Sequence, residues 1–401
     1  MDRRSFMRAA SHAMAAGLWV PKLARADDMA GALPAGAIHS SSLEALPGKR
    51  ALIKRTWRPP NYETPLELFR QAYTPNDAFY VRWHGTVPDV TIADWRLRIG
   101  GPAVRTPREY TREDLRRKFK PAEVVAVNQC SSNRRGLFAP HVPGVQWGFG
   151  AMGNARWSGV ALKDLLHDAG VTATALEVVA NGADGLMLTG PDFSKSLPLW
   201  KALDPDTLLA FEMNGKPLPA LNGFPARLVV PGWTGTYWLK AVTELTVVDK
   251  PFDGFWMKTA YRVPKGMFGA SGFESQETPQ NVPITSIKVN SLITSHATGA
   301  KLAAGRGATL AGIAWDGGSG IRTVQVSTDG GANWIDAKLD HDLGRYGWRQ
   351  WHQGFKPETP GRLALMARAV AMDGSTQPEH LIVNPAGYHH NIVHRVECDV
   401  A

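Results

Sequence analysis

The segment Val127-Asn128-Gln129-Cys130-Ser131-Ser132-Asn133-Arg134-Arg135-Gly136 places one of the two cysteines of the chain at the end of a strand-like run. The loop that follows is polar, contains two arginines and ends at a glycine. A single cysteine is most often a small buried hydrophobic residue. Two neighbouring arginines, however, favour the thiolate, which suits a transition metal better than magnesium or calcium. The segment therefore indicates either a core position or a metal site with Cys130 as its protein ligand.

A second segment, Phe79-Tyr80-Val81-Arg82-Trp83-His84, has the alternation of a β-strand. Successive side chains of a strand point to opposite faces, so the three apolar residues share one face. The other face consists of Tyr80, Arg82 and His84. An edge strand with a solvated polar face would show the same pattern. An arginine beside a histidine also suits an oxyanion, because guanidinium donors match oxyanion geometry.

Three further motifs follow in order along the chain, and together with the first two they carry a resemblance to a known family. They are Gly148–Val160 (GFGAMGNARWSGV), Glu212–Pro219 (EMNGKPLP) and Gly223–Gly232 (GFPARLVVPG). All five segments resemble, in the same order, motifs of the molybdenum-containing sulfite oxidase family. The resemblance extends from about Phe79 to the C-terminus.

Within that family, two segments look like those of the bacterial sulfite dehydrogenases, which are periplasmic enzymes that work with a cytochrome c. These segments are the cysteine loop and Pro231–Lys240 (PGWTGTYWLK). Asn222 stands where the animal enzymes have a histidine before the G-F-P motif. The resemblance implies an α+β fold, in which a sulfite-oxidase-type molybdopterin-binding domain precedes an immunoglobulin-like β-sandwich of the dimerisation type.

The residue pattern predicts the same two parts. One helix is expected at 162–169, because its apolar residues fall on one face and Gly170 follows at its C-terminal end. Short strands are expected at 176–180, 227–230 and 243–248. After about Pro283, Asp-Gly turn signals recur between short strands, which is typical of a β-sandwich. We therefore place a catalytic domain at 27–283, with an irregular lead-in to about residue 75, and a β-sandwich domain at 284–401.

The resemblance also implies the site residues. Cys130 would ligate the molybdenum, and the pterin dithiolene and oxo groups would complete its coordination. The positions that match cofactor-binding positions of the family are Phe79, Tyr80, Val81, Arg82, His84, Cys130, Asp184, Asn222, Arg227, Trp238, Leu239 and Lys240. Those that match the substrate pocket or the catalytic residues are Tyr261, Arg82, Arg135, His84, Trp147 and Arg395. For Asp184, Arg227 and the two tryptophans, a turn, surface or core role is the simpler alternative.

The function that the resemblance implies is oxidation of sulfite to sulfate with electron transfer to a c-type cytochrome. Arginines at 82, 135 and 395 would supply forked donors for the sulfite dianion. A sulfane-sulfur dehydrogenase or a sulfoxide reductase of the same fold would keep the cysteine and the metal but change the pocket. A non-catalytic exported binding protein would contain no molybdenum and would tolerate replacement of Cys130.

The first residues predict export. Asp2–Arg8 (DRRSFMR) is a twin-arginine sequence, an apolar run extends from Ala9 to Val20, and Ala24–Ala26 has the small residues of a cleavage site. We expect a twin-arginine signal peptide at 1–26 and a periplasmic protein that is exported folded.

Composition narrows the possible partners. The formal net charge of +9 occurs without a long Lys/Arg run, which argues against nucleic acid. No later stretch is apolar enough to span a bilayer. The sequence lacks a C-x-x-C-H motif, so we expect no haem on this chain and a separate cytochrome. An oxidising compartment would permit a disulfide between Cys130 and Cys398. A homodimer and a heterodimer with the cytochrome both stay open.

Overall fold

The first part of the chain that the structure describes forms a small antiparallel sheet. The computed structural model describes residues 43–185, 190–266 and 276–401, so the predicted signal peptide at 1–26 lies outside the described residues. The sheet has the order β1 (Leu43–Ala45), β2 (Ala51–Thr56), β3 (Asn61–Glu63) and β4 (Val81–Arg82). The 3-10 helix η3 (Leu66–Arg70) follows β3.

The predicted irregular lead-in is therefore wrong for residues 43–63. Leu52 of β2 packs with Tyr62, Val81 and Trp83 in one buried cluster, so these strands have a hydrophobic face to bury. Pro59 and Pro60 lie in the turn between β2 and β3, so their missing backbone N–H groups remove no hydrogen bond between the two strands. The high proline content of the segment thus marks a turn rather than an absence of strands.

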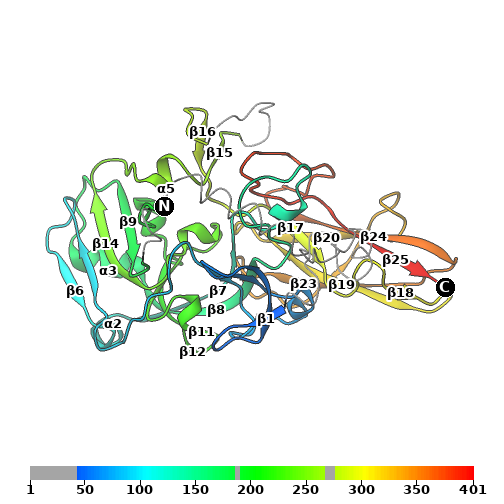
Figure 1. The fold of residues 1–401 in the computed structure, drawn as a ribbon, viewed down its shortest axis with the longest axis horizontal. Helices are drawn as coiled ribbons and strands as arrows, with labels where there is room; N and C mark the ends of the chain where they lie inside the picture. The colour runs from blue at the N-terminus through cyan, green and yellow to red at the C-terminus, as the bar shows by residue number, and fades with distance from the viewer. Residues whose placement is uncertain (1–42, 186–189, 267–275) are drawn as a thin grey trace, which may run out of the picture. The chain divides into compact units, whose positions relative to one another are not determined.

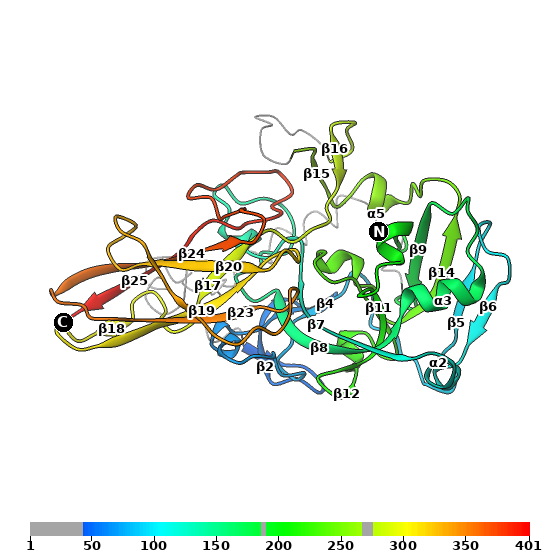
Figure 2. The ribbon, with the colours of Figure 1, turned by 180° about the vertical axis from the view of Figure 1, so that it is seen from behind.

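In the described part of the first domain, two larger sheets and four short α-helices form most of the remaining structure (Figures 1 and 2). One sheet has the order β10 (Lys195–Pro198), β9 (Glu177–Gly182), β14 (Val242–Val248), β5 (Leu97–Gly100) and β6 (Arg108–Tyr110). The other has the order β12 (Lys216–Pro217), β11 (Leu208–Met213), β8 (Met152–Ala161) and β7 (Pro121–Gln129), with β13 (Arg227–Val229) also paired to β11. The α-helices are α2 (Arg112–Lys118), α3 (Leu162–Ala169), α4 (Leu199–Ala202) and α5 (Phe255–Lys258).

The helix predicted at 162–169 is confirmed as α3. Its apolar residues are buried, and Gly170 ends it with a positive φ of 70°. That backbone conformation favours glycine, because it costs a side chain with a Cβ atom steric strain. The strands predicted near 176–180, 227–230 and 243–248 are confirmed as β9, β13 and β14 within two residues.

The chain after the hairpin of β15 (Arg262–Pro264) and β16 (Asn281–Pro283) forms a β-sandwich. One sheet has the order β17 (Asn290–Ile293), β19 (Ala308–Trp315), β23 (Arg349–Phe355) and β22 (Lys338–Leu339). The other has the order β18 (Lys301–Leu302), β25 (His394–Val400), β24 (Gly361–Ala371), β20 (Ile321–Ser327) and β21 (Ile335–Asp336). Residues from both sheets, including Leu310, Trp351, Val324 and Val326, form one buried cluster.

A shared hydrophobic cluster joins the two domains beside the cysteine loop. It contains Phe69, Val127, Phe149 and Met152 of the first domain together with Ile287, Leu292, Ile313, Trp315 and Trp348 of the second. The Trp315 indole N–H also donates to Gln129 Oε1 at 2.6 Å, at the end of β7. The end of β7 is therefore fixed from the second domain.

The two cysteines lie in different hydrophobic clusters, Cys130 in the first domain and Cys398 in the sandwich. Both are free, so the disulfide that the sequence would permit is not formed. Among the described residues, every helix is too short or too polar to span a bilayer.

Three buried histidines lie just before β25 and at its first residue, close to the cysteine loop. Burial lowers the pKa of His389 to about 3, and burial together with the charge of Arg134 lowers that of His390 to about 3. Burial also lowers the pKa of His394, whose Nδ1 accepts a hydrogen bond from the Ile293 N–H at 2.9 Å. These histidines are neutral in the folded protein at neutral pH.

We expect the protein to lose stability on acidification because of these histidines. Below about pH 6.5 an unfolded histidine binds a proton that the folded one does not, so each lowers the free energy of unfolding by up to about 1.4 kcal/mol per pH unit. His390→Gln should reduce this slope by about that amount between pH 5.5 and 4. Urea unfolding at several pH values checks this, with the exposed His141→Gln as control. Equal slopes in both variants would contradict the buried neutral state of His390.

Candidate active site

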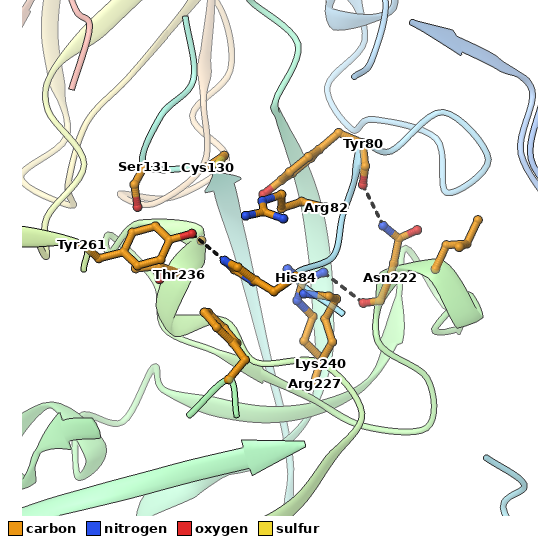
Figure 3. A pocket seen from close by; sticks show the side chains of 13 residues that line it. Tyr80, Arg82, His84, Cys130, Ser131, Asn222, Arg227, Thr236, Lys240 and Tyr261 are labelled. Atoms are coloured by element: carbon orange, nitrogen blue, oxygen red, sulfur yellow. Dashed lines mark hydrogen bonds between the residues drawn. The ribbon is translucent and has the colours of Figure 1, made fainter. Parts of the chain in front are cut away.

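Side chains of the segment 79–84 and of the cysteine loop meet in one pocket of the first domain (Figure 3). Tyr80, Arg82 and His84 all line it, which confirms the predicted polar face, whereas Val81 and Trp83 belong to the hydrophobic cluster beside β2. The empty space of the hollow, together with open solvent in front of it, amounts to about 450 Å³. Its lining consists of Tyr80, Arg82, His84, Cys130, Ser131, Phe193, Leu221, Asn222, Arg227, Gly235, Thr236, Lys240 and Tyr261.

Cys130 follows β7 directly, and its loop is held by backbone hydrogen bonds. The Cys130 N–H donates to the Ala151 carbonyl at 2.9 Å, and the Ala151 N–H donates to Asn133 Oδ1 at 3.0 Å. The Cys130 thiol is 3.4 Å from Ser132 Oγ. Arg134 has a positive φ of 68° and turns the chain into the 3-10 helix η4 (Arg135–Leu137). The loop therefore presents a nearly buried thiol to the pocket in a fixed position.

The pocket collects positive charge without a carboxylate in its lining, and Asp184 of the adjoining hollow acts on Lys240 only through space. Arg82, Arg227 and Lys240 line it, and none of the three forms an ion pair with a carboxylate of the described residues. Burial lowers the pKa of Arg227 to about 10 and that of Lys240 to about 7. The pocket therefore destabilises the charged forms of both side chains as long as no anion is bound. Charges withdrawn from water are normally paired. The arrangement therefore suits an anionic ligand.

Several polar atoms around the pocket are buried without a hydrogen-bond partner. They are Ser131 Oγ, Thr236 Oγ1, Asn128 Nδ2, Arg227 Nε and His84 Nδ1. Buried polar atoms of native proteins almost always have a partner. A cluster of such atoms beside one hollow indicates that a polar ligand completes their hydrogen bonds.

Tyr261, which is buried, and His84, which is partly buried, form a pair on the opposite wall from Asn222 (Figure 3). The Tyr261 hydroxyl is 2.6 Å from His84 Nε2. Burial raises the pKa of Tyr261, while burial and then the charge of Arg82 lower the pKa of His84. Tyr261 also has a φ of 57°, a rare conformation for a bulky residue that is found most often at functional sites. Both groups are therefore neutral at pH 7 and share one hydrogen-bonding proton.

Other predicted site residues lie behind the lining rather than in it, and for Trp147 the predicted place in the lining of the substrate pocket is therefore wrong. Phe79 stacks on Tyr80 with ring centroids 5.5 Å apart, and Trp147 meets the same ring edge-on at 6.5 Å. Trp238 packs near the Arg227 guanidinium, and Leu239 is buried beside it. These residues support the lining residues by packing.

Asp184 lines a second hollow that shares Arg82, His84 and Phe193 with the first. Burial raises the pKa of this carboxyl group, and the charge of Lys240 opposes that effect. The predicted site therefore continues from the first hollow toward Asp184.

Two predicted substrate arginines do not line the pocket. The prediction for Arg395 is wrong: its side chain is half exposed and pairs with Glu397 at 3.2 Å. In β25 the residues on either side of it, His394 and Val396, take the buried face, so alternation turns Arg395 to solvent. Arg135 is buried and donates from Nε and Nη2 to the Ala386 carbonyl. Arg135 instead lies over the Tyr388 ring, 5.3 Å from its centroid, and that ring in turn stacks on Tyr261.

The structure adds residues that the sequence reasoning missed. Tyr388, from the second domain, stacks on Tyr261 with centroids 5.7 Å apart. Lys195 is buried, donates to the Trp256 carbonyl at 2.6 Å and lies against the Tyr261 ring. A lysine on the same strand face as buried Leu197 was a usable signal for Lys195. Tyr388 had no such signal, because its contact depends on how the C-terminal segment folds back.

The comparisons with known proteins agree with this site. Residues 84–256 match the oxidoreductase molybdopterin binding domain, and residues 281–401 match the Mo-co oxidoreductase dimerisation domain. The mitochondrial sulfite oxidase of Drosophila melanogaster is 34% identical over 88% of this chain and 64% of the relative. The sulfite oxidase of Gallus gallus is 33% identical over 80% of this chain and 72% of the relative.

A solved structure supports the fold over almost the whole chain. The sulfane dehydrogenase SoxCD from Paracoccus pantotrophus matches with a TM-score of 0.72 and 26% identity, over 94% of this chain and 93% of that one. By contrast, the chain spans somewhat less than two thirds of the length of the mitochondrial sulfite oxidases that it matches.

The family's cofactor, molybdenum bound to molybdopterin, fits the residues of the pocket. Cys130 would supply the sulfur ligand of the metal, the cations of the lining suit the negative charge of a phosphate and a dithiolene, and the unpartnered polar atoms need a polar ligand. Motif order, fold, pocket and relatives all lead to the same conclusion: the chain belongs to the sulfite oxidase family of molybdenum-cofactor oxidoreductases.

Proposed function

We propose that the protein oxidises sulfite to sulfate and passes the electrons to a c-type cytochrome. The observation that supports this most is the pocket in which Cys130, Arg82 and the Tyr261–His84 pair meet without a carboxylate in its lining. The positive charge of this pocket attracts a small sulfur oxyanion, and no carboxylate of the lining repels it. Curated relatives named sulfite oxidase add weight to sulfite as the substrate.

The residues of the chain have distinct parts in this proposal. When bound, the molybdenum cofactor supplies the redox chemistry of the reaction. Arg82 attracts and orients the anion through its forked donors. Tyr261 keeps its proton at neutral pH because burial raises its pKa, so its hydroxyl can donate to an oxygen atom of the substrate. His84 accepts or returns a proton at Nε2, since it stays neutral and lies 2.6 Å from that hydroxyl.

A sulfane dehydrogenase is the second candidate, because the solved structure that matches over 94% of the chain carries that name. Such an enzyme would use the same cysteine and the same cofactor. The two candidates differ in the sulfur compound that must fit beside Arg82 and Tyr261.

Location and assembly belong to the same proposal. The twin-arginine sequence at 2–8 supports export of the folded protein to the periplasm, where c-type cytochromes accept electrons. The match of residues 281–401 to a dimerisation domain supports an assembly of two chains. This assembly is either a homodimer or a heterodimer with the cytochrome.

Steady-state kinetics with three substrates tests the proposed reaction. With cytochrome c as acceptor, kcat/KM for sulfite should exceed that for thiosulfate by about 10²-fold or more, because a site built for one oxyanion discriminates strongly against another. Methionine sulfoxide, tested as an oxidant with a reduced dye, should give no comparable turnover. A preference for thiosulfate would favour the sulfane reaction, and a preference for the sulfoxide would reject oxidation altogether.

Replacement of Tyr261 by phenylalanine tests the role of its hydroxyl. Tyr261→Phe should lower kcat for sulfite by about 10²-fold, because the substrate loses a positioned proton donor, while the unfolding temperature changes little. Tyr237→Phe is the matched control, since the Tyr237 hydroxyl is buried nearby and has no hydrogen-bond partner. If both variants lose the same fraction of activity, the Tyr261 hydroxyl has no special part in turnover.

A further inference from the structure

Lys49 lies behind the pocket wall and comes from the short segment before β2. Only 7% of its surface is exposed. Its ammonium donates three hydrogen bonds, to the Asn76 carbonyl at 2.6 Å, to the Phe79 carbonyl at 3.0 Å and to Asn222 Oδ1 at 2.5 Å. All three acceptors are neutral, and no carboxylate of the described residues pairs with Lys49.

Asn222 connects Lys49 to the pocket. Its side chain lines the hollow, and Nδ2 donates to the Tyr80 carbonyl at 3.0 Å (Figure 3). Its own carbonyl accepts a hydrogen bond from Arg227 Nη1 at 2.9 Å. Lys49 is therefore one side chain away from the part of the pocket where Arg227 and Lys240 lie.

The buried position of Lys49 destabilises its charged form. Burial, and then the like charge of Arg227, lowers the pKa of Lys49 to about 7, despite an opposing effect of Asp77. Anchoring of the segment does not require this charge, because the neighbouring Arg50 already forms an exposed ion pair with Asp77 at 2.8 Å. A buried ammonium without a carboxylate partner costs less when another negative charge lies close to it.

We propose that Lys49 is a positioning residue for the anionic end of the cofactor. It orients Asn222 toward the pocket and adds its positive charge to those of Arg227 and Lys240, and together these groups hold the phosphate of molybdopterin. The inference rests on the cofactor of the family and is independent of the sulfur compound that is oxidised.

Removal of the charge should weaken phosphate binding and cofactor retention. Lys49→Met should raise the Kd of inorganic phosphate for the cofactor-free full chain about tenfold, measured by calorimetry. The same variant, purified with cofactor, should release pterin faster on dialysis, measured by the fluorescence of the oxidised pterin. Arg50→Gln is the control, because it loosens the same segment without changing the charge behind Asn222.

Proton uptake separates an electrostatic role from simple anchoring. A nearby anion favours the protonated ammonium, so phosphate binding near pH 7.5 should take up more protons in the wild type than in Lys49→Met. Calorimetry in two buffers of different ionisation enthalpy measures that difference. The ionisation of phosphate itself is common to both proteins and cancels.

Two results would overturn the proposal. One is a wild-type phosphate Kd and wild-type proton uptake in Lys49→Met, and the other is equal loss of pterin from Lys49→Met and Arg50→Gln.

If Lys49→Met does not fold, Lys49→Arg replaces it. Arginine keeps its charge at every pH tested, so phosphate affinity should fall less between pH 6 and 9 than in the wild type. An identical fall in both proteins would equally overturn the proposal.

Discussion

Positive charge in a pocket whose lining contains no carboxylate is the constraint on which the rest of this site depends. Arg82, Arg227 and Lys240 line the hollow, and no described carboxylate pairs with any of them. Burial away from water destabilises each charged side chain, and this is why the pKa values of Arg227 and Lys240 are lowered. An anionic cofactor relieves that cost, so its binding and the stability of the pocket are linked. The neutral Tyr261–His84 pair fits the same logic, because a further charge there would add repulsion.

The fold holds these groups in place from three directions. The small N-terminal sheet fixes the strand that carries Tyr80 and Arg82. The cluster shared by both domains fixes the end of β7, and with it Cys130. The segment before β25 packs Tyr388 against Tyr261 and accepts hydrogen bonds from Arg135. The second domain is thus part of the structural support of the site.

Local patterns in the sequence predicted those features that depend on neighbouring residues alone, such as the face of a strand or the extent of a helix. Alternation placed Tyr80, Arg82 and His84 on one face, and the helical period together with Gly170 located α3. The failure at Arg395 has a different origin, since the face that a residue of β25 takes depends on pairing with β24 and packing in the sandwich. Lys49 reaches Asn222 across 173 positions of sequence, and periodicity contains no information about such a contact.

Anomalous diffraction at the molybdenum absorption edge, on crystals of the protein purified with its cofactor, tests the central claim most directly. We predict one metal per chain, bonded to the sulfur of Cys130, with electron density for an anionic group beside Arg227 and Lys240. A folded protein that binds no molybdenum, although its host makes the cofactor, would contradict this account. So would a metal bound away from Cys130.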